Sequence, residues 1–178
     1  MKSKITIIWQ FCVVPLLVAV ISLAGVASAQ DPPASKKDAS ASKSSSLGAK
    51  DKTFMKKAAK GGMMEVSMGN LAAQNGQSDD VKSFGKRMVT DHGKANDELK
   101  SIAEKKGVTL PSKEPTHKWS SDKTYMDTMV KDHEKDLAEF QEEAKNGSDP
   151  DVKKFAEDTA KVIQEHLELA KETQKKLQ

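Results

Sequence analysis

From residue 53 onward, apolar residues recur at spacings of three and four, and no stretch alternates apolar and polar residues as a β-strand does. This period places the apolar residues along one side of an α-helix. The pattern therefore predicts an all-α chain. It is interrupted at Asn75-Gly76, at 107–121 and at Asn146-Gly147, so we expect four helices.

The predicted helices span about 53–74, 80–106, 122–146 and from 150 onward. The first and last connections are short, which makes their helices antiparallel neighbours. The longer connection, 107–121, is expected to return the chain at the end where the second helix finishes. These features predict an antiparallel up-down four-helix bundle. The buried stripe expected for the last helix comprises Val152, Phe155, Thr159, Val162, His166, Leu169 and Thr173.

The N-terminal region has the pattern of an export signal. Lys2 and Lys4 precede 25 uncharged residues that end in Ala27-Ser28-Ala29, the small-x-small pattern that signal peptidases cleave. We therefore predict a signal peptide at 1–29, cleavage after Ala29, and a periplasmic or cell-envelope location. An uncleaved membrane anchor is the alternative, because the run is long enough to span a bilayer.

The stretch that follows the predicted cleavage site, 30–50, is rich in Ser, Pro and Lys and offers almost nothing to bury. Such a stretch cannot offset the entropy cost of becoming ordered. We predict that it is a flexible linker and that the bundle domain occupies 51–178.

The composition of the chain excludes several classes of function. Cys12 is the only cysteine and lies in the predicted signal, so the mature chain would have no disulfide, thiolate metal site or cysteine nucleophile. The formal net charge of +3 falls to +1 without Lys2 and Lys4, which leaves no electrostatic footprint for nucleic acid. No phosphate-binding loop or nucleophile elbow is present. We assign no catalytic residue, favour a binding protein over an enzyme, and expect association with the cell envelope.

Each predicted core stripe carries one polar residue where an apolar one is expected. These residues are Glu65, His92, His133 and His166, and a rise of 1.5 Å per residue places all four near the middle of the bundle. Three imidazoles and one carboxylate suit zinc, copper, nickel or iron. We therefore predict that these four residues form a site for a divalent transition metal or a small ligand.

An acidic residue precedes each of these histidines. Asp91, Asp132 and Glu165 are predicted to accept hydrogen bonds from metal-ligating imidazoles. Because a metal binds only deprotonated histidines, affinity is expected to fall below about pH 6.

Two alternatives to the metal site stay open. In the first, the four residues form a buried polar network that fixes the register of the helices. The protein would then be a non-catalytic envelope or stress protein that acts through its helical surfaces. In the second, the buried stripes are assigned to the wrong side of the helices.

The residues around these positions resemble a known bacterial family. The matching strings are Glu65-Val66, Gly69-Asn70-Leu71-Ala72, Val81-Lys82-x-Phe84, Met88-Val89-x-Asp91-His92, Met129-Val130-x-Asp132-His133 and Phe155-Ala156. They resemble the exported or outer-membrane proteins catalogued as domain of unknown function 4142. The resemblance implies a ferritin-like four-helix bundle and no established activity.

The comparison with ferritins has a limit. Di-iron ferritins carry Glu-x-x-His on two helices, whereas the positions three before these histidines are Val89, Val130 and Ile163. A carboxylate-bridged di-iron centre is therefore not expected.

Overall fold

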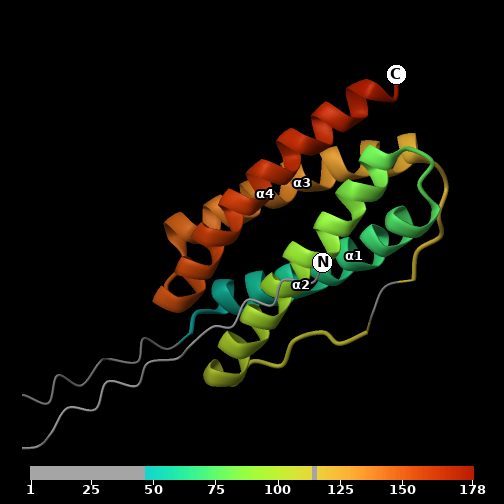
Figure 1. The fold of residues 1–178 in the computed structure, drawn as a ribbon. Coiled ribbons are helices and arrows are strands. Elements are labelled where there is room, and N and C mark those ends of the chain that lie inside the picture. The colour runs from blue at the N-terminus through green and yellow to red at the C-terminus, as the bar shows by residue number, and fades with distance from the viewer. Residues whose placement is uncertain (1–46, 114–115) are drawn as a thin grey trace, which may run out of the picture. The chain divides into compact units, whose positions relative to one another are not determined.

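The computed structural model describes residues 47–113 and 116–178, all within the unit Ser42–Gln178. They form four helices, α1 (Ala49–Asn75), α2 (Asp79–Lys106), α3 (Asp122–Asn146) and α4 (Pro150–Lys176), packed as a four-helix bundle (Figure 1). The predicted all-α class is confirmed. The predicted signal peptide, its cleavage site and the linker as far as residue 46 lie outside the described residues, and α1 begins at Ala49 rather than near Thr53.

The helices form two antiparallel hairpins, α1 with α2 and α3 with α4, as predicted. Hydrogen bonds at the two ends show how the hairpins are joined. Asp122, at the start of α3, accepts from the backbone N–H groups of Gln77 (3.0 Å) and Ser78 (2.7 Å), between α1 and α2. At the opposite end, Asp51 in the first turn of α1 accepts from the N–H groups of Ser148 and Asp149, at 3.0 Å each.

The start of α3 therefore lies beside the α1–α2 turn, at the end of the bundle opposite to the end of α2 (Figure 1). The connection between α2 and α3 must therefore cross the length of the bundle. The expectation that this connection returns at the end where α2 finishes was wrong, and the helix order is up-down-down-up. About fifteen extended residues reach about 50 Å, whereas a helix of 27 residues is about 40 Å long, so the crossover is long enough. The ferritin-like classification stays a prediction.

The apolar core consists of two clusters, one toward each end of the bundle. The first includes Phe54, Leu99, Phe140, Phe155 and Ile163. The second includes Val81, Phe84, Met88, Tyr125, Met126 and Met129. On every helix, the polar residue singled out in the sequence lies between positions that belong to the two clusters. Apolar side chains therefore close off the middle of the bundle at both ends.

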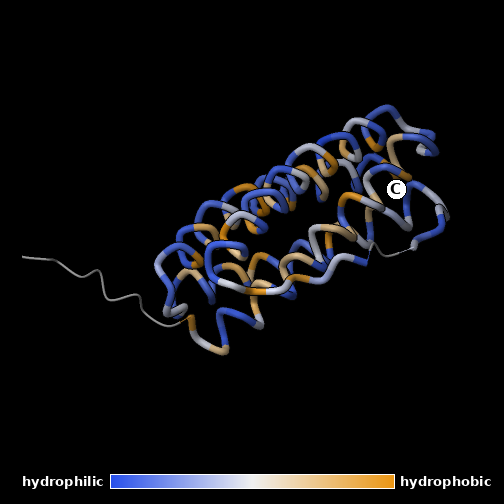
Figure 2. The backbone as a smooth tube through the Cα atoms, turned by 90° about the horizontal axis from the view of Figure 1, so that it is seen from below, coloured by the Kyte–Doolittle hydropathy of each residue, from blue (hydrophilic) through white to orange (hydrophobic). Residues whose placement is uncertain are grey.

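Hydrophobic and hydrophilic stretches alternate along all four helices, as helical periodicity requires (Figure 2). One predicted core position is wrong. Val162 is 36% exposed, whereas Ile163 is only 1% exposed. The buried stripe of α4 steps from Thr159 by four residues rather than three, and both candidates are apolar and β-branched. In the described part of the chain, no helix combines the length and apolar composition needed to cross a bilayer.

The backbones of α1 and α2 approach each other at two glycines. A Cβ atom at Gly85 would lie 2.6 Å from the carbonyl oxygen of Gly69, and one at Gly69 would lie 2.7 Å from the carbonyl oxygen of Gly85. No real Cβ fits at such distances. This close approach holds the first hairpin together on the side of the second apolar cluster.

Candidate metal centre

Three helices each bring one histidine to the middle of the bundle. One ring nitrogen from each of His92, His133 and His166 lies within 4.8 Å of the other two. The ring centroids are 5.3 to 5.7 Å apart, and the residues are 8%, 1% and 0% exposed. In a tetrahedral site the ligating nitrogens are about 3.3 Å apart, so movements of about 1.5 Å or less would close this group around a metal ion.

Hydrogen bonds orient two of the three rings. Nδ1 of His133 donates to the carbonyl oxygen of Met129, one turn earlier on α3, at 2.8 Å. Nε2 of His166 donates to the Asp91 carboxylate on α2 at 3.0 Å. Since a carbonyl or a carboxylate only accepts, these bonds fix the tautomers. They leave a lone pair on Nε2 of His133 and on Nδ1 of His166.

Those two nitrogens, together with Nε2 of His92, are buried and have no hydrogen-bond partner within residues 47–113 and 116–178. A buried polar atom without a partner is uncommon and costs about 1–3 kcal/mol. The chain thus carries three such atoms in one small volume. Neutral imidazole nitrogens in this state are the form that binds a metal ion.

The surroundings keep the cluster neutral. Burial, and then the proximity of His133 and His166, lowers the pKa of His92 to about 3. Burial and His166 lower the pKa of His133 to about 4. Burial also lowers the pKa of His166, which the hydrogen bond to Asp91 opposes. The expectation that metal affinity falls below about pH 6 assumed ordinary histidines, whereas burial lowers the pKa of all three imidazoles here.

Of the three acids predicted to support the histidines, Asp91 contacts one. It accepts from His166 on a neighbouring helix and not from His92, which directly follows it and points about 100° away around the helix. Burial raises the pKa of Asp91, but the bonds from His166 and Arg87 outweigh this and lower it. Among the described residues, Asp132 and Glu165 make no hydrogen bond to the cluster.

Arg87 is a residue that the sequence analysis missed. Its guanidinium pairs with Asp91 at 3.3 Å and with Glu165 on α4 at 2.6 Å. It therefore holds the carboxylate that orients His166 and also links α2 to α4. The signal in the sequence is the spacing of four between Arg87 and Asp91, which places the two side chains together on one helix face.

Glu65, the fourth predicted ligand, comes from α1, the helix that contributes no cluster histidine. It is 0% exposed, and neither carboxyl oxygen has a hydrogen-bond partner in the described part of the chain. Burial raises the pKa of Glu65 well above 4.5, and Asp136 and Asp132 raise it further, so burial favours the protonated form of this group. Its oxygens do not belong to the group of atoms within 4.8 Å of one another.

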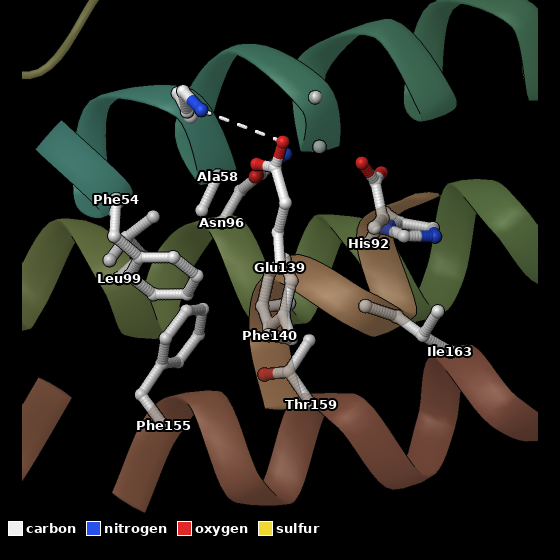
Figure 3. A pocket seen from close by; sticks show the side chains of 15 residues that line it. Phe54, Ala58, His92, Asn96, Leu99, Glu139, Phe140, Phe155, Thr159 and Ile163 are labelled. Carbon is white, nitrogen blue, oxygen red and sulfur yellow. Dashed lines mark ion pairs between the residues drawn. The ribbon is translucent and has the colours of Figure 1, made fainter. Parts of the chain in front are cut away.

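A cavity of about 30 Å³ lies against His92. Figure 3 shows His92 beside Ile163 at one end of the cavity and the rings of Phe54, Phe140 and Phe155 toward the other. Asn96 and Thr159 add polar atoms to its lining. A volume of this size holds about two water molecules.

A larger groove of about 350 Å³ lies between α2 and α4, and His92 and His166 both line it. Ala95, Thr159 and Ile163 line the groove and the cavity alike, as His92 does. These residues therefore form the wall between the two spaces. The groove gives the histidine cluster a side that is open toward solvent.

A comparison with known proteins identifies one family. The family described as Domain of unknown function (DUF4142) matches residues 34–173, which include all four predicted metal ligands. No curated protein and no solved structure matches the chain.

Proposed function

The chain belongs to the family described as Domain of unknown function (DUF4142), and because that description assigns no activity, we propose from its own residues that it binds one divalent transition-metal ion. The ligands are His92, His133 and His166. The observation that carries the proposal is the convergence of three buried imidazoles. Nε2 of His92, Nε2 of His133 and Nδ1 of His166 lack hydrogen-bond partners among the described residues, while the other ring nitrogens of His133 and His166 are hydrogen-bonded.

The same observation argues against a purely structural polar network. Such a network stabilises a core when its members satisfy one another's hydrogen bonds. Here Nδ1 of His133 and Nε2 of His166 have hydrogen-bond partners. Nε2 of His92, Nε2 of His133 and Nδ1 of His166 have none among the described residues. A metal-ligating histidine typically donates the N–H of one ring nitrogen to an acceptor and offers the lone pair of the other nitrogen to the metal.

Glu65 completes the proposed ligand set. Three neutral imidazoles leave both positive charges of a divalent ion uncompensated, and a buried charge needs a partner. Glu65 is a fully buried carboxyl group without a partner in the described segments, at the matching level of α1. On metal binding it would lose its proton and turn toward the ion. This set suits zinc, copper(II), nickel or iron.

We further propose that the protein acts in the periplasm or cell envelope. The support is the sequence pattern of residues 1–29, with Lys2 and Lys4 before an apolar run that ends in Ala27-Ser28-Ala29. N-terminal sequencing of the mature protein tests this. A mature chain that begins at Gln30 agrees with the proposal, and one that retains Lys2 would indicate a membrane anchor.

Elemental analysis tests the metal site. Tag-free protein purified without chelator should take up about one metal ion per chain, as expected for a single three-histidine centre. The triple variant His92→Ala/His133→Ala/His166→Ala should bind none. His117→Ala is the matched control, because His117 is the fourth histidine and does not belong to the cluster.

The result that would contradict the proposal is equally direct. Equal metal content in the wild type and the triple variant would place the ion elsewhere. A wild type that takes up no zinc, copper, nickel or iron, with circular dichroism showing an intact helical fold, would leave the histidines as a structural feature.

A further inference from the structure

We propose that the cavity against His92 is where the bound metal ion accepts an exogenous ligand of two or three heavy atoms. This inference rests on the proposed metal site and adds the class of ligand that the site takes. The ligand coordinates the ion through one end and fills the cavity with the other.

The position of the cavity supports this assignment. His92 lines it directly, so the cavity reaches one of the three proposed histidine ligands. A metal ion with three histidines and Glu65 can still expand to five ligands. The cavity lies beside the proposed ligand His92, where a fifth ligand would extend into it.

The size of the cavity limits the ligand. About 30 Å³ corresponds to about two water molecules, or one linear triatomic anion such as azide. Part of the remaining lining consists of large buried side chains, of which Leu99 is 1% exposed and Phe155 is 2% exposed. The more exposed side chains of Lys57 and Glu139 also line the cavity. A ring such as imidazole would require these side chains to move.

The lining also offers hydrogen bonds to a small ligand. Asn96 and Thr159 carry polar atoms into the cavity, and Lys57, Asp136 and Glu139 add charged groups beside its apolar side chains. A Cβ atom at Gly62 would collide with the Asn96 side chain, so the glycine on α1 makes the room in which that amide lies. A pocket with a few placed polar groups on an apolar lining is typical of a small-molecule site.

The cavity shares part of its lining with the groove between α2 and α4. The wall between them includes Ala95 and Thr159, both small side chains. Small ligands can therefore reach the cavity from solvent through local side-chain motion, without separation of the hairpins.

Cobalt(II)-loaded protein tests the inference, because tetrahedral and five-coordinate cobalt differ in visible absorption. Azide should change the spectrum of the wild type in a saturable titration, whereas imidazole at the same concentrations should not. Thr159→Leu fills the cavity and should weaken azide binding at least tenfold while cobalt still binds. Thr173→Leu is the matched control, because Thr173 is also a buried threonine of α4 but does not line the cavity.

Three outcomes would contradict the inference, and they have different meanings. Cobalt binding without an azide response would overturn this inference and leave the metal site standing. A response to imidazole equal to that to azide, or equal azide affinity in Thr159→Leu and the wild type, would show that the ligand binds outside the cavity. Absence of cobalt binding would overturn the metal site and this inference together. Thermal unfolding of both threonine variants verifies that they are folded.

Discussion

Replacing Glu65 by glutamine should stabilise the metal-free protein and weaken the metal-bound one. Glu65 is fully buried, and burial raises its pKa well above 4.5. At any pH between 4.5 and the folded-state pKa, the folded protein holds a proton that the unfolded chain has released. The free energy of unfolding therefore falls by about 1.4 kcal/mol for each pH unit in this range. Glutamine is neutral in both states and removes this loss.

Urea unfolding of chelator-treated protein, followed by circular dichroism, measures the effect. The two proteins should be similar in stability at pH 4.5, and Glu65→Gln should gain about 1.4 kcal/mol over the wild type for each pH unit above that. The exposed Glu142→Gln is the control and should follow the wild type. With saturating zinc the order should reverse, because the variant loses a ligand. Tenfold weaker binding removes about 1.4 kcal/mol of stabilisation.

The reasoning is refuted if metal-free Glu65→Gln is less stable than the wild type at pH 6.5. That result would mean that Glu65 is ionised in the folded protein and has a partner that compensates its charge. An unchanged response to zinc in the variant would show separately that Glu65 is not a ligand.

Three further predictions concern stability. Burial lowers the pKa of His92 to about 3, so below pH 6.5 the unfolded chain binds a proton that the folded chain does not. As the pH falls from 6.5 to 5.5, the free energy of unfolding of the metal-free wild type should therefore fall by about 1.4 kcal/mol per pH unit relative to His92→Asn, measured by urea unfolding. Gly85→Ala should lower the free energy of unfolding by about 3 kcal/mol, because the added Cβ atom meets backbone atoms. Gly93→Ala should raise it by about 0.5–1 kcal/mol, because a Cβ atom there has no neighbour within 4 Å. Equal effects of the two substitutions would contradict the close approach of α1 and α2. Asp51→Ala should cost about 2–4 kcal/mol in the same assay, since it removes the acceptor for the N–H groups of Ser148 and Asp149, and a neutral result would show that this tie is dispensable.

The depth of the histidines was predictable even though the direction of the second hairpin was not. His133 and His166 lie near the middle of α3 and α4, and the middle of a helix stays at mid-bundle when the hairpin is turned end for end. Short loops encode antiparallel neighbours, but a connection of about fifteen residues can either return locally or cross the bundle. The bonds that decide the crossover, which distant backbone N–H groups donate to Asp122 and Asp51, have no local sequence pattern.

The contacts between side chains of different helices could not be predicted from the sequence. The three acids beside the histidines were predicted as a set, yet only Asp91 reaches an imidazole, and that imidazole belongs to α4. Glu165 has the same neighbour relation to His166 but pairs with Arg87. Spacing along a helix predicts which face a side chain occupies, whereas its partner depends on the rotation of the adjacent helix.

The helix order has a consequence for how the protein holds together. His92 belongs to the first hairpin, and His133 and His166 belong to the second, so a bound ion would join the hairpins as a covalent cross-link does. The chain segment between His92 and His133 would be closed into a loop of about 40 residues, and closing such a loop removes about 4 kcal/mol of entropy from the unfolded chain. In a chain whose only cysteine is Cys12, this coordination cross-link would take the place of a disulfide. Cleavage of the crossover 107–121 would then leave two hairpins that a bound ion holds together in addition to their shared apolar clusters.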